Sequence, residues 1–499
     1  MSELIMALLV YGAIIFAVAL VANHYTKSGA DFFLAGRKIS GWLTALGAGA
    51  SDMSSWLLMV LPGLVYVSGL NNIWMPIALS IGAYFNWRFV AKRLRIYTEI
   101  ANNSLTLPSF IYNRFRGTEA GSSDRWLECI SGLAMMIFFT IYTTSGFMAG
   151  AEVLRLVLHI PHQWALLLIV VVTLSYTLIG GFFAVSWVDF FQGGLMFFSL
   201  LIVPIVAVLH LGGLAQASHE IVAQLPAHLD IFHQISILSL LSLLGWGLGY
   251  FGQPHINVRF MAVRHVRELP LATRVCMTWM IISLCGAMLT GLLGRLYFHT
   301  PLLAQPETVF ISLAHACFSP FVVGILVSAI LSAVMSTVSA QMLMSASIFT
   351  EDFYLGFLRT GASAREELLV SRLSLFAFAL LAFIIAALPN QSLFGSIGFA
   401  WSGLGASFGP VTVLSLYWRR MSRAGAIAGI ATGAAVVLLW ELRRFLAVGG
   451  LFNNPQVLPG FSMLPGVFFS FLSIIYFSRK YPPQADIVDQ HFTEMQQRL

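Results

Sequence analysis

Two short stretches decide the fold: residues 49–56 read GASDMSSW, and residues 245–254 read GWGLGYFGQP. Each lies within an apolar segment long enough to cross a bilayer as a helix. Glycine costs roughly 1 kcal/mol relative to alanine inside a helix, and Pro254 removes a backbone donor, so we expect both segments to unwind locally. Unwound backbone is tolerated at membrane depth only where it faces protein or a watery cavity. The alternative is that these glycines only allow helices to pack closely.

The composition around these stretches is that of a membrane protein. Of the 499 residues, 58% are hydrophobic and 10% are charged, whereas a soluble domain carries about 25% charged residues. This excludes a soluble enzyme, a nucleic-acid-binding protein and a disordered scaffold. The net charge of +6 fits basic loops on the cytoplasmic side of a membrane. Walker lysine and hydrolase motifs are missing from the sequence, so we expect neither ATP-driven transport nor an enzyme.

We predict an all-α polytopic membrane protein with thirteen transmembrane helices in the cell (inner, cytoplasmic) membrane. Their approximate centres are Ala13, Ser54, Ile81, Ile141, Val171, Phe198, Trp246, Leu284, Met335, Leu380, Leu404, Ala434 and Phe469. With the N-terminus outside, only Arg155, Arg295, Arg443 and Arg444 fall in outer loops. The other 23 of the 27 Lys and Arg residues, Arg259 among them, fall on the inner side. This bias predicts an N-out, C-in orientation.

The two interrupted segments are the second and the seventh predicted spans. They are five spans apart, so they enter the membrane from opposite sides. Interrupted spans at matching positions of two inverted halves indicate the binding site of a secondary transporter. A passive channel does not need this arrangement, so we favour alternating access.

Asp52 and Asp189 are the acidic residues that lie well inside predicted spans. An ionised carboxylate at bilayer depth costs at least about 2.5 kcal/mol, so it needs a cation or hydrogen-bond donors. We find no Lys or Arg in the middle of a predicted span, and we therefore expect a bound cation, a proton or dense hydrogen bonding. The alternatives are that Asp52 only braces the unwound turn and that Asp189 hydrogen-bonds at the inner interface.

The ninth predicted span carries a stripe of hydroxyl groups. Its members are Ser328, Ser332, Ser336 and Ser339, with Thr337 beside them. Their spacing places them on one helical face. Hydroxyl oxygens without fixed charge, together with carbonyls of a broken helix, suit Na⁺. The alternative is that each hydroxyl donates to the carbonyl four residues earlier, as is common in membrane helices.

Together these stretches give the sequence a resemblance to the sodium/solute symporter family, and within it to the proline-transporting members. The matching segments are GASDMS at 49–54, WLLM at 56–59, FTIY at 139–142, AVSW at 184–187 with Asp189, GWGLGYFGQPH at 245–255 and MST at 335–337. The resemblance implies a leucine-transporter-like fold with two inverted five-helix repeats, 40–212 and 213–420. An extra N-terminal span and inner loop, 1–39, would precede them. Two C-terminal spans, 421–480, and a cytoplasmic tail, 481–499, would follow.

The resemblance also implies sodium-coupled secondary uptake of L-proline by alternating access, with Na⁺, the solute and the lipid bilayer as partners and without nucleic acid or an obligate protein partner. The implied sodium ligands are the carbonyls of Ala50, Met53 and Ala333 and the hydroxyls of Ser336 and Thr337. The implied ion-coupling residues are Asp52, Asp189 and Ser339. The implied substrate residues are Ser54, Ser55, Trp56, Tyr142, Trp246, Tyr250 and Pro254. The alternatives are another small carboxylate or polar solute, and a symporter-like membrane sensor, for which residues 481–499 offer no signalling module.

Two positions depart from the family pattern. Ser55 stands where the proline-transporting members have glycine, beside the implied substrate pocket, which puts the substrate in question. Ala340 has no hydroxyl where two-sodium relatives place a serine. This favours one Na⁺ per transport cycle, with Ser339 and Asp189 left as an incomplete second site.

Overall fold

The computed structural model contains only helices in the part of the chain that it describes, apart from an isolated bridge between Ile39 and Val263. It describes residues 2–26, 28–115, 126–298, 303–359, 361–388, 392–445, 460–483 and 486–499. Three basic residues that contribute to the orientation prediction lie outside this part: Lys27, Arg116 and Arg125. The side chains of Arg443 and Arg444 also lie outside it.

The helices follow one another along the chain with short 3-10 or π segments between them. In the first half they are α1 (Ser2–Asn23), α2 (Gly29–Leu34), η1 (Ala35–Arg37), α3 (Gly41–Ser55), η2 (Trp56–Val60), α4 (Leu61–Ser68), η3 (Gly69–Ile73), α5 (Trp74–Phe85), η4 (Asn86–Ala91), α6 (Lys92–Ile100), α7 (Leu107–Phe115), α8 (Trp126–Leu158), α9 (His162–His210), α10 (Leu214–Gln224) and α11 (Pro226–Leu229). In the second half they are α12 (Ile237–Gly245), η5 (Trp246–Gly252), α13 (Pro254–Ala262), η6 (Val266–Glu268), α14 (Leu269–Tyr297), η7 (Pro306–Thr308), α15 (Val309–Cys317), α16 (Pro320–Ser347), η8 (Ile348–Leu358), α17 (Ala364–Ala386), α18 (Leu393–Tyr417), α19 (Arg423–Phe445), α20 (Met463–Lys480) and α21 (Asp486–Arg498).

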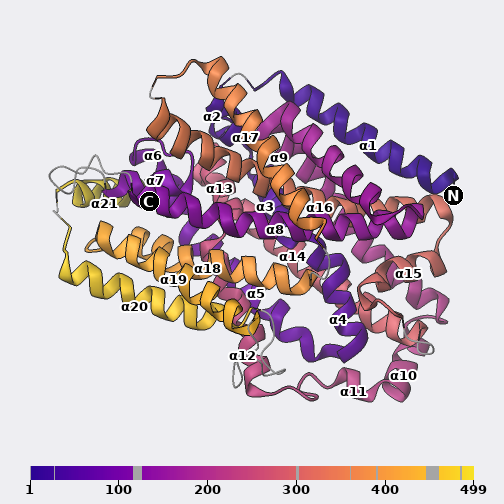
Figure 1. The fold of residues 1–499 in the computed structure, drawn as a ribbon. Coiled ribbons are helices and arrows are strands. Elements are labelled where there is room, and N and C mark those ends of the chain that lie inside the picture. Colours follow the sequence, from indigo (N-terminus) through magenta and orange to yellow (C-terminus); the bar gives the residue numbers. More distant parts are fainter. Residues whose placement is uncertain are drawn as a thin grey trace.

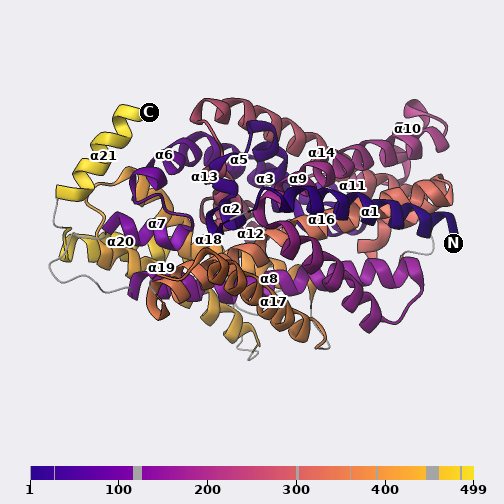
Figure 2. The same cartoon turned by 90° about the horizontal axis from the view of Figure 1, so that it is seen from above.

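Nine helical segments of the described chain are long and apolar enough to cross a membrane. Two of them each cover two predicted spans: 41–100, and α9, which bends at Gly181 (φ +54°, ψ −151°). The predicted seventh span is divided between α12, η5 and α13. The two termini lie at opposite ends of the bundle (Figures 1 and 2), as an odd number of spans requires. The count of thirteen and the N-out, C-in orientation stay predictions.

The helix α16 lies at the centre of the bundle, where it packs against α1, α3, α8 and α9. In an 18-residue apolar stretch of the segment Pro320–Gly356, which contains α16, 83% of the residues are buried. In the corresponding stretch of α1, at the periphery, 28% are buried. On the other side of the bundle, α18, α19 and α20 pack against one another (Figure 1). The hydroxyl-bearing helix is therefore enclosed by protein.

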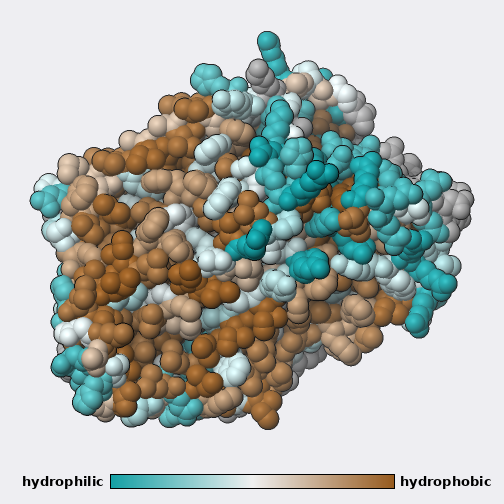
Figure 3. All heavy atoms as spheres, turned by 180° about the vertical axis from the view of Figure 1, so that it is seen from behind, coloured by the Kyte–Doolittle hydropathy of each residue, from teal (hydrophilic) through white to brown (hydrophobic). Residues whose placement is uncertain are grey.

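The molecular surface separates into apolar and polar regions. In Figure 3, hydrophobic residues cover a broad band, and hydrophilic residues gather toward the end of the bundle that carries α6, α7 and α21 in Figure 1. This band suits the hydrocarbon core of a bilayer. The molecule is a multi-pass membrane protein.

Glycines bring the backbone of η5 directly against two neighbouring helices. A Cβ atom on Gly82 of α5 would lie 2.0 Å from the carbonyl oxygen of Gly247. On the other side of η5, a Cβ atom on Gly252 would lie 2.5 Å from the carbonyl oxygen of Leu404 in α18. Several glycines of the second interrupted segment therefore serve close packing, in addition to breaking the helix. In this segment the interpretation that glycines only allow close packing is incomplete, because the helix is also interrupted at Gln253.

The predicted tail 481–499 contains α21, which packs on α6. Phe492 is 2% exposed, and its ring meets that of Tyr97 at a centroid distance of 5.6 Å. Arg498 lies 3.7 Å from Glu99, and Lys92 donates a hydrogen bond to the Leu499 carbonyl. These contacts fix the C-terminal helix at the polar end of the bundle.

Candidate ion and solute site

The first interrupted segment breaks at Ser54, as the sequence predicts. Ser54 has φ +43° and ψ −167°, which no helix contains, and the chain continues as the π-helix η2. The Trp56 N–H donates to the Ser54 hydroxyl at 3.2 Å, which stabilises the new direction of the chain. A non-glycine residue with positive φ is uncommon and indicates a backbone that its surroundings hold in place.

The second interrupted segment changes from the 3-10 turn η5 to α13 through the extended residue Gln253. The Gln253 side chain donates to the carbonyls of Gly249 and Trp401, at 3.3 and 3.2 Å. Pro254 then begins α13, where its missing N–H costs nothing. The two predicted breaks are thus present, and each is supported by a polar side chain.

Four of the five implied sodium ligands meet between α3 and α16. The Ser336 hydroxyl donates to the Ala50 carbonyl at 2.8 Å and lies 3.3 Å from the Ala333 carbonyl. The Thr337 hydroxyl donates to the same Ala333 carbonyl at 3.1 Å. Met53 lies one turn further along α3, where its carbonyl accepts a backbone N–H at the start of η2. All five residues are buried, so this cluster offers neutral oxygens in a water-poor environment.

Asp52 lies next to this cluster and is 8% exposed. Its carboxylate accepts a hydrogen bond from the Tyr250 hydroxyl, which ties the first interrupted segment to the second. In the described chain no Lys or Arg forms an ion pair with Asp52. Among the described residues, the hydrogen-bond partner of this carboxylate is the Tyr250 hydroxyl.

For Asp189 the prediction that no Lys or Arg serves as a partner is wrong. Arg259 of α13 forms a buried ion pair with Asp189 of α9, and the two side chains are 1% and 0% exposed. The guanidinium also donates to the hydroxyls of Ser51 and Ser186, at 2.8 and 3.1 Å. The sequence predicted Arg259 in an inner loop, after the seventh predicted span. Ser339 donates to the Ser336 carbonyl at 3.1 Å.

The stripe of hydroxyls divides into two groups. Ser328 donates to the Gly324 carbonyl at 2.8 Å, and Ser332 donates to the Ser328 carbonyl at 2.7 Å. Ser332 also lies 2.9 Å from the hydroxyl of Tyr11 in α1. The alternative of bonding within the helix describes Ser328, Ser332 and Thr337, whose hydroxyls each donate to the carbonyl four residues earlier. Among the hydroxyls of the stripe, the hydrogen bond to α3 comes from Ser336.

A small central cavity lies between the two breaks. It is lined by Asp52, Met53, Ser54, Trp56, Leu79, Tyr142, Trp246, Tyr250, Ile397 and Trp401. Five of the seven implied substrate residues are in this set, whereas Ser55 and Pro254 are buried beside it. The free volume is about 20 Å³, roughly the minimum for one water molecule. A larger solute must therefore displace side chains.

Trp401 of α18, which was not predicted as a site residue, organises the aromatic wall of this central cavity. Its indole N–H donates to the Trp246 carbonyl at 2.9 Å, and the two rings stack at a centroid distance of 6.2 Å. Tyr250 meets the Trp401 ring edge-on at 5.3 Å. The Trp246 ring also stacks against that of Phe394, at a centroid distance of 5.7 Å. Trp401 lies in an apolar segment without a break, so its local sequence gave no signal.

His255 was also missed as a site residue. It is fully buried, and neither ring nitrogen has a hydrogen-bond partner within the described chain. Its ring meets that of Tyr142 edge-on, at a centroid distance of 6.0 Å. Buried polar atoms without partners are rare, and this imidazole lies behind a side chain of the central cavity.

The sequence of this chain is similar to those of several known proteins. The chain is 42% identical to the osmoregulated proline transporter OpuE of Bacillus subtilis, over 94% of this chain and 95% of that protein. It is 43% identical to the high-affinity proline transporter PutP of Bacillus subtilis, covering 96% and 98%. It is also 43% identical to the sodium/proline symporter of Haemophilus influenzae, covering 95% and 94%.

Solved structures show the fold. A Na⁺-coupled sialic acid symporter superposes with a TM-score of 0.80 at 16% identity, covering 96% of this chain and 98% of that one. Mhp1, a nucleobase-cation-symport-1 family transporter, superposes with a TM-score of 0.57 at 12% identity, covering 94% and 99%. The leucine-transporter-like fold is confirmed. Residues 32–433 match the Sodium:solute symporter family, whose members are transporters and not enzymes. The chain belongs to the sodium:solute symporter family.

Proposed function

We propose that this symporter takes up L-proline together with Na⁺ by alternating access. The observation that carries the proposal is the juxtaposition of the neutral oxygens of Ala50, Ala333, Ser336 and Thr337 with a carboxylate and an aromatic cavity. Three relatives that cover nearly the whole chain at 42–43% identity have proline transport in their names.

The sodium ion would bind between α3 and α16. Its ligands would be the carbonyls of Ala50, Met53 and Ala333 and the hydroxyls of Ser336 and Thr337. In binding, the ion would replace the hydrogen bonds that the two hydroxyls now donate to carbonyls. Asp52 would contribute negative charge without direct pairing to a basic residue, and Asp189 and Ser339 would support ion coupling nearby.

The solute would bind in the central cavity. The proposed contacts are Ser54, Ser55, Trp56, Tyr142, Trp246, Tyr250 and Pro254. An apolar pyrrolidine ring suits the aromatic wall, and the amino ends of interrupted helices favour a carboxylate. Within the inverted repeats 40–212 and 213–420, the helix bundle would rock and release both ligands to the cytoplasm. The segments 1–39, 421–480 and 481–499 would surround this core.

Radiolabelled L-proline uptake into proteoliposomes tests the proposal. An inward Na⁺ gradient should drive accumulation, and the same gradient of K⁺ should not. Because binding linkage is reciprocal, Na⁺ must raise the affinity for proline by the factor by which proline raises the affinity for Na⁺. Uptake that is indifferent to the Na⁺ gradient would refute the coupling.

The substrate assignment has its own test because Ser55 departs from the family pattern. Competition of labelled uptake by a panel of amino acids and pantothenate ranks the solutes. If a second small carboxylate competes better than proline does, Na⁺ coupling stands and proline is not the preferred substrate.

A further inference from the structure

The peripheral helix α1 sends one polar side chain into the interior of the bundle. It lies along α9 and α16 (Figures 1 and 2). Its buried residues form one stripe, which consists of Leu4, Ala7, Tyr11, Ile15, Ala19 and Ala22. Tyr11 is the one member of this stripe with a polar side chain, and it is 7% exposed. A buried tyrosine hydroxyl needs hydrogen-bond partners.

The Tyr11 hydroxyl joins α1 to both neighbouring helices. The side-chain amide of Gln192 in α9 donates to it at 2.8 Å. On α16, the Ser332 hydroxyl oxygen lies 2.9 Å from it, and Tyr11 donates to the Met335 sulfur at 3.7 Å. Gln192, Ser332 and Met335 are each at most 1% exposed. Three helices therefore meet at one buried hydroxyl group.

The contacts of Tyr11 on α16 adjoin the proposed sodium ligands. Ala333 lies between Ser332 and Met335 in the chain, and Ser336 directly follows Met335. The Ala333 carbonyl and the Ser336 hydroxyl are two of the proposed ligands. The same turn of α16 thus carries the ion-binding oxygens and the two contacts with α1.

This turn is held on opposite sides. A second tyrosine, Tyr176 of α9, donates to the Met335 carbonyl at 3.0 Å. Across the turn, the Ser336 hydroxyl donates to the Ala50 carbonyl of α3 at 2.8 Å. The two tyrosine hydroxyls therefore fix the backbone and the side chain of Met335, next to the residue that faces α3.

Close packing fixes α1 itself on either side of Tyr11. A Cβ atom on Gly324 of α16 would lie 2.8 Å from the Leu4 carbonyl oxygen. A Cβ atom on Gly180 of α9 would lie 3.0 Å from the Ala19 carbonyl oxygen. Backbone in such direct contact cannot shift without separating. The position of the Tyr11 hydroxyl is thus set by the docking of the whole helix.

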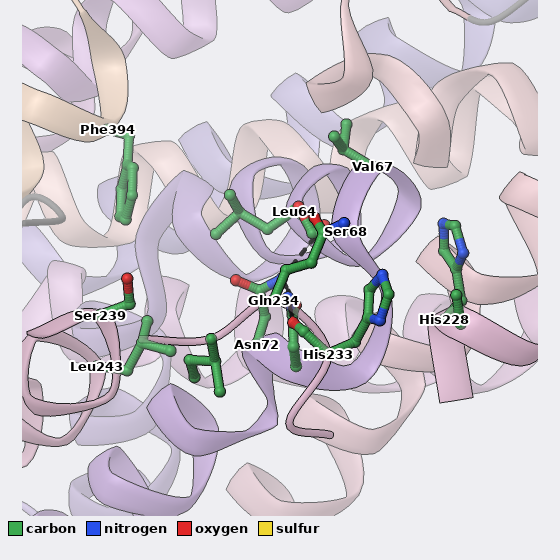
Figure 4. A pocket seen from close by; sticks show the side chains of 13 residues that line it. Leu64, Val67, Ser68, Asn72, His228, His233, Gln234, Ser239, Leu243 and Phe394 are labelled. Atoms are coloured by element: carbon green, nitrogen blue, oxygen red, sulfur yellow. Dashed lines mark hydrogen bonds between the residues drawn. The ribbon is translucent and has the colours of Figure 1, made fainter. Parts of the chain in front are cut away.

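Tyr11 lines neither of the cavities beside the interrupted segments. None of the described residues that line the central cavity lies in α1. The same holds for a larger cavity of about 420 Å³, which includes His228 and Phe394 and is shown in Figure 4. An effect of Tyr11 on transport must therefore act through α9 or α16.

We infer that Tyr11 is a positioning residue of the sodium site. Its hydroxyl holds the turn of α16 that carries Ala333 and Ser336 in the geometry that binds Na⁺. The inference rests on the sodium site proposed above. Because α1 lies outside the two proposed repeats, 40–212 and 213–420, a helix added to the transporter core contributes to ion binding.

Na⁺-dependent thermal stabilisation of the purified full chain tests this role. The readout is the Na⁺ concentration at half-maximal stabilisation. Tyr11→Phe keeps the ring and removes the hydroxyl, so this concentration should rise by about three- to tenfold, the range expected for the loss of one hydrogen bond. The affinity for L-proline at saturating Na⁺ should stay unchanged, because Tyr11 does not line the central cavity.

Two matched controls separate the hydroxyl from the docking of α1. Tyr25→Phe removes the hydroxyl of a side chain that follows α1 and is 61% exposed, and it should leave the Na⁺ requirement unchanged. Ile15→Ala leaves a cavity under α1 one turn after Tyr11, where Ile15 is 1% exposed. It should lower the melting temperature by about 2–5 °C and leave the Na⁺ requirement unchanged.

The outcomes distinguish the two proposals. If Tyr11→Phe needs the same Na⁺ concentration as the unmodified chain, or if Ile15→Ala raises that concentration equally, the positioning role is overturned and the sodium site stands. If Tyr11→Phe does not fold, Ser332→Ala removes the same contact from α16 and should raise the concentration by about threefold; an unchanged value overturns the role. If Na⁺ does not stabilise the unmodified chain, the proposed sodium site fails, and the role of Tyr11 fails with it.

Discussion

The buried ion pair between Arg259 and Asp189 makes the sharpest stability prediction. Both side chains are almost fully excluded from solvent, so Arg259→Met leaves a buried carboxylate without its cation. Removing one partner of a buried pair costs about 3–5 kcal/mol. With an unfolding entropy of about 2.1 cal/mol/K per residue over 499 residues, each kcal/mol of lost stability lowers the melting temperature by about 1 °C. The melting temperature should therefore fall by about 3–5 °C.

Thermal unfolding of purified protein in one detergent measures this effect. The double variant Arg259→Met with Asp189→Leu removes both charges and should recover most of the loss, since apolar replacement of a whole pair is often neutral. Arg155→Met is the matched control, because Arg155 pairs with Glu152 at 2.6 Å with a side chain 37% exposed. An exposed pair contributes at most about 1 kcal/mol. The reasoning is refuted if Arg259→Met melts at the same temperature as the unmodified chain. It is also refuted if the double variant loses as much stability as the two single variants added together.

Three further outcomes follow from the site and the packing. Ser336→Ala should weaken Na⁺ binding by about tenfold or more, which corresponds to the loss of a hydrogen bond to a charged group. Ser328→Ala should leave Na⁺ binding unchanged, because the Ser328 hydroxyl donates within α16. Na⁺-dependent thermal stabilisation measures both variants, and equal effects would contradict the ion site. Phe492→Ala should destabilise the chain by about 3 kcal/mol if the docking of α21 contributes to the fold, as buried Phe→Ala changes do; an unchanged melting temperature argues against it. Gly82→Ala should prevent folding, since its Cβ would overlap the Gly247 carbonyl, and normal membrane levels would disprove that contact.

The sequence predicted those features that depend on local chemistry. The stretches 49–56 and 245–254, chosen for their glycines and Pro254, contain the breaks at Ser54 and Gln253. Glycine and proline alone do not decide this, because α18 keeps its helix with five glycines and Pro410. Hydroxyl spacing placed Ser336 on the striped face of its helix, because the helical period brings residues three and four apart to one side, whereas Thr337 was implied by the family resemblance. Both kinds of signal are contained within a few consecutive residues.

What the sequence did not predict depends on contacts between distant segments. Arg259 follows the seventh predicted span and was expected in an inner loop, whereas the fold places it against Asp189. Trp401 and Ile397 occur in an unbroken apolar helix, and only packing shows which of its faces meets the cavity. Ser328 and Ser336 share one spacing, but only Ser336 has the Ala50 carbonyl opposite it.

The contacts of η5 with α5 and α18 restrict how this protein can change shape. Side chains yield by rotating about single bonds, whereas peptide groups in direct contact cannot slide past each other without separating. Where Gly82 meets Gly247 and Gly252 meets Leu404, peptide groups touch. The segments η5, α5 and α18 must therefore move as one rigid body during the transport cycle, and the hinges lie elsewhere in the chain.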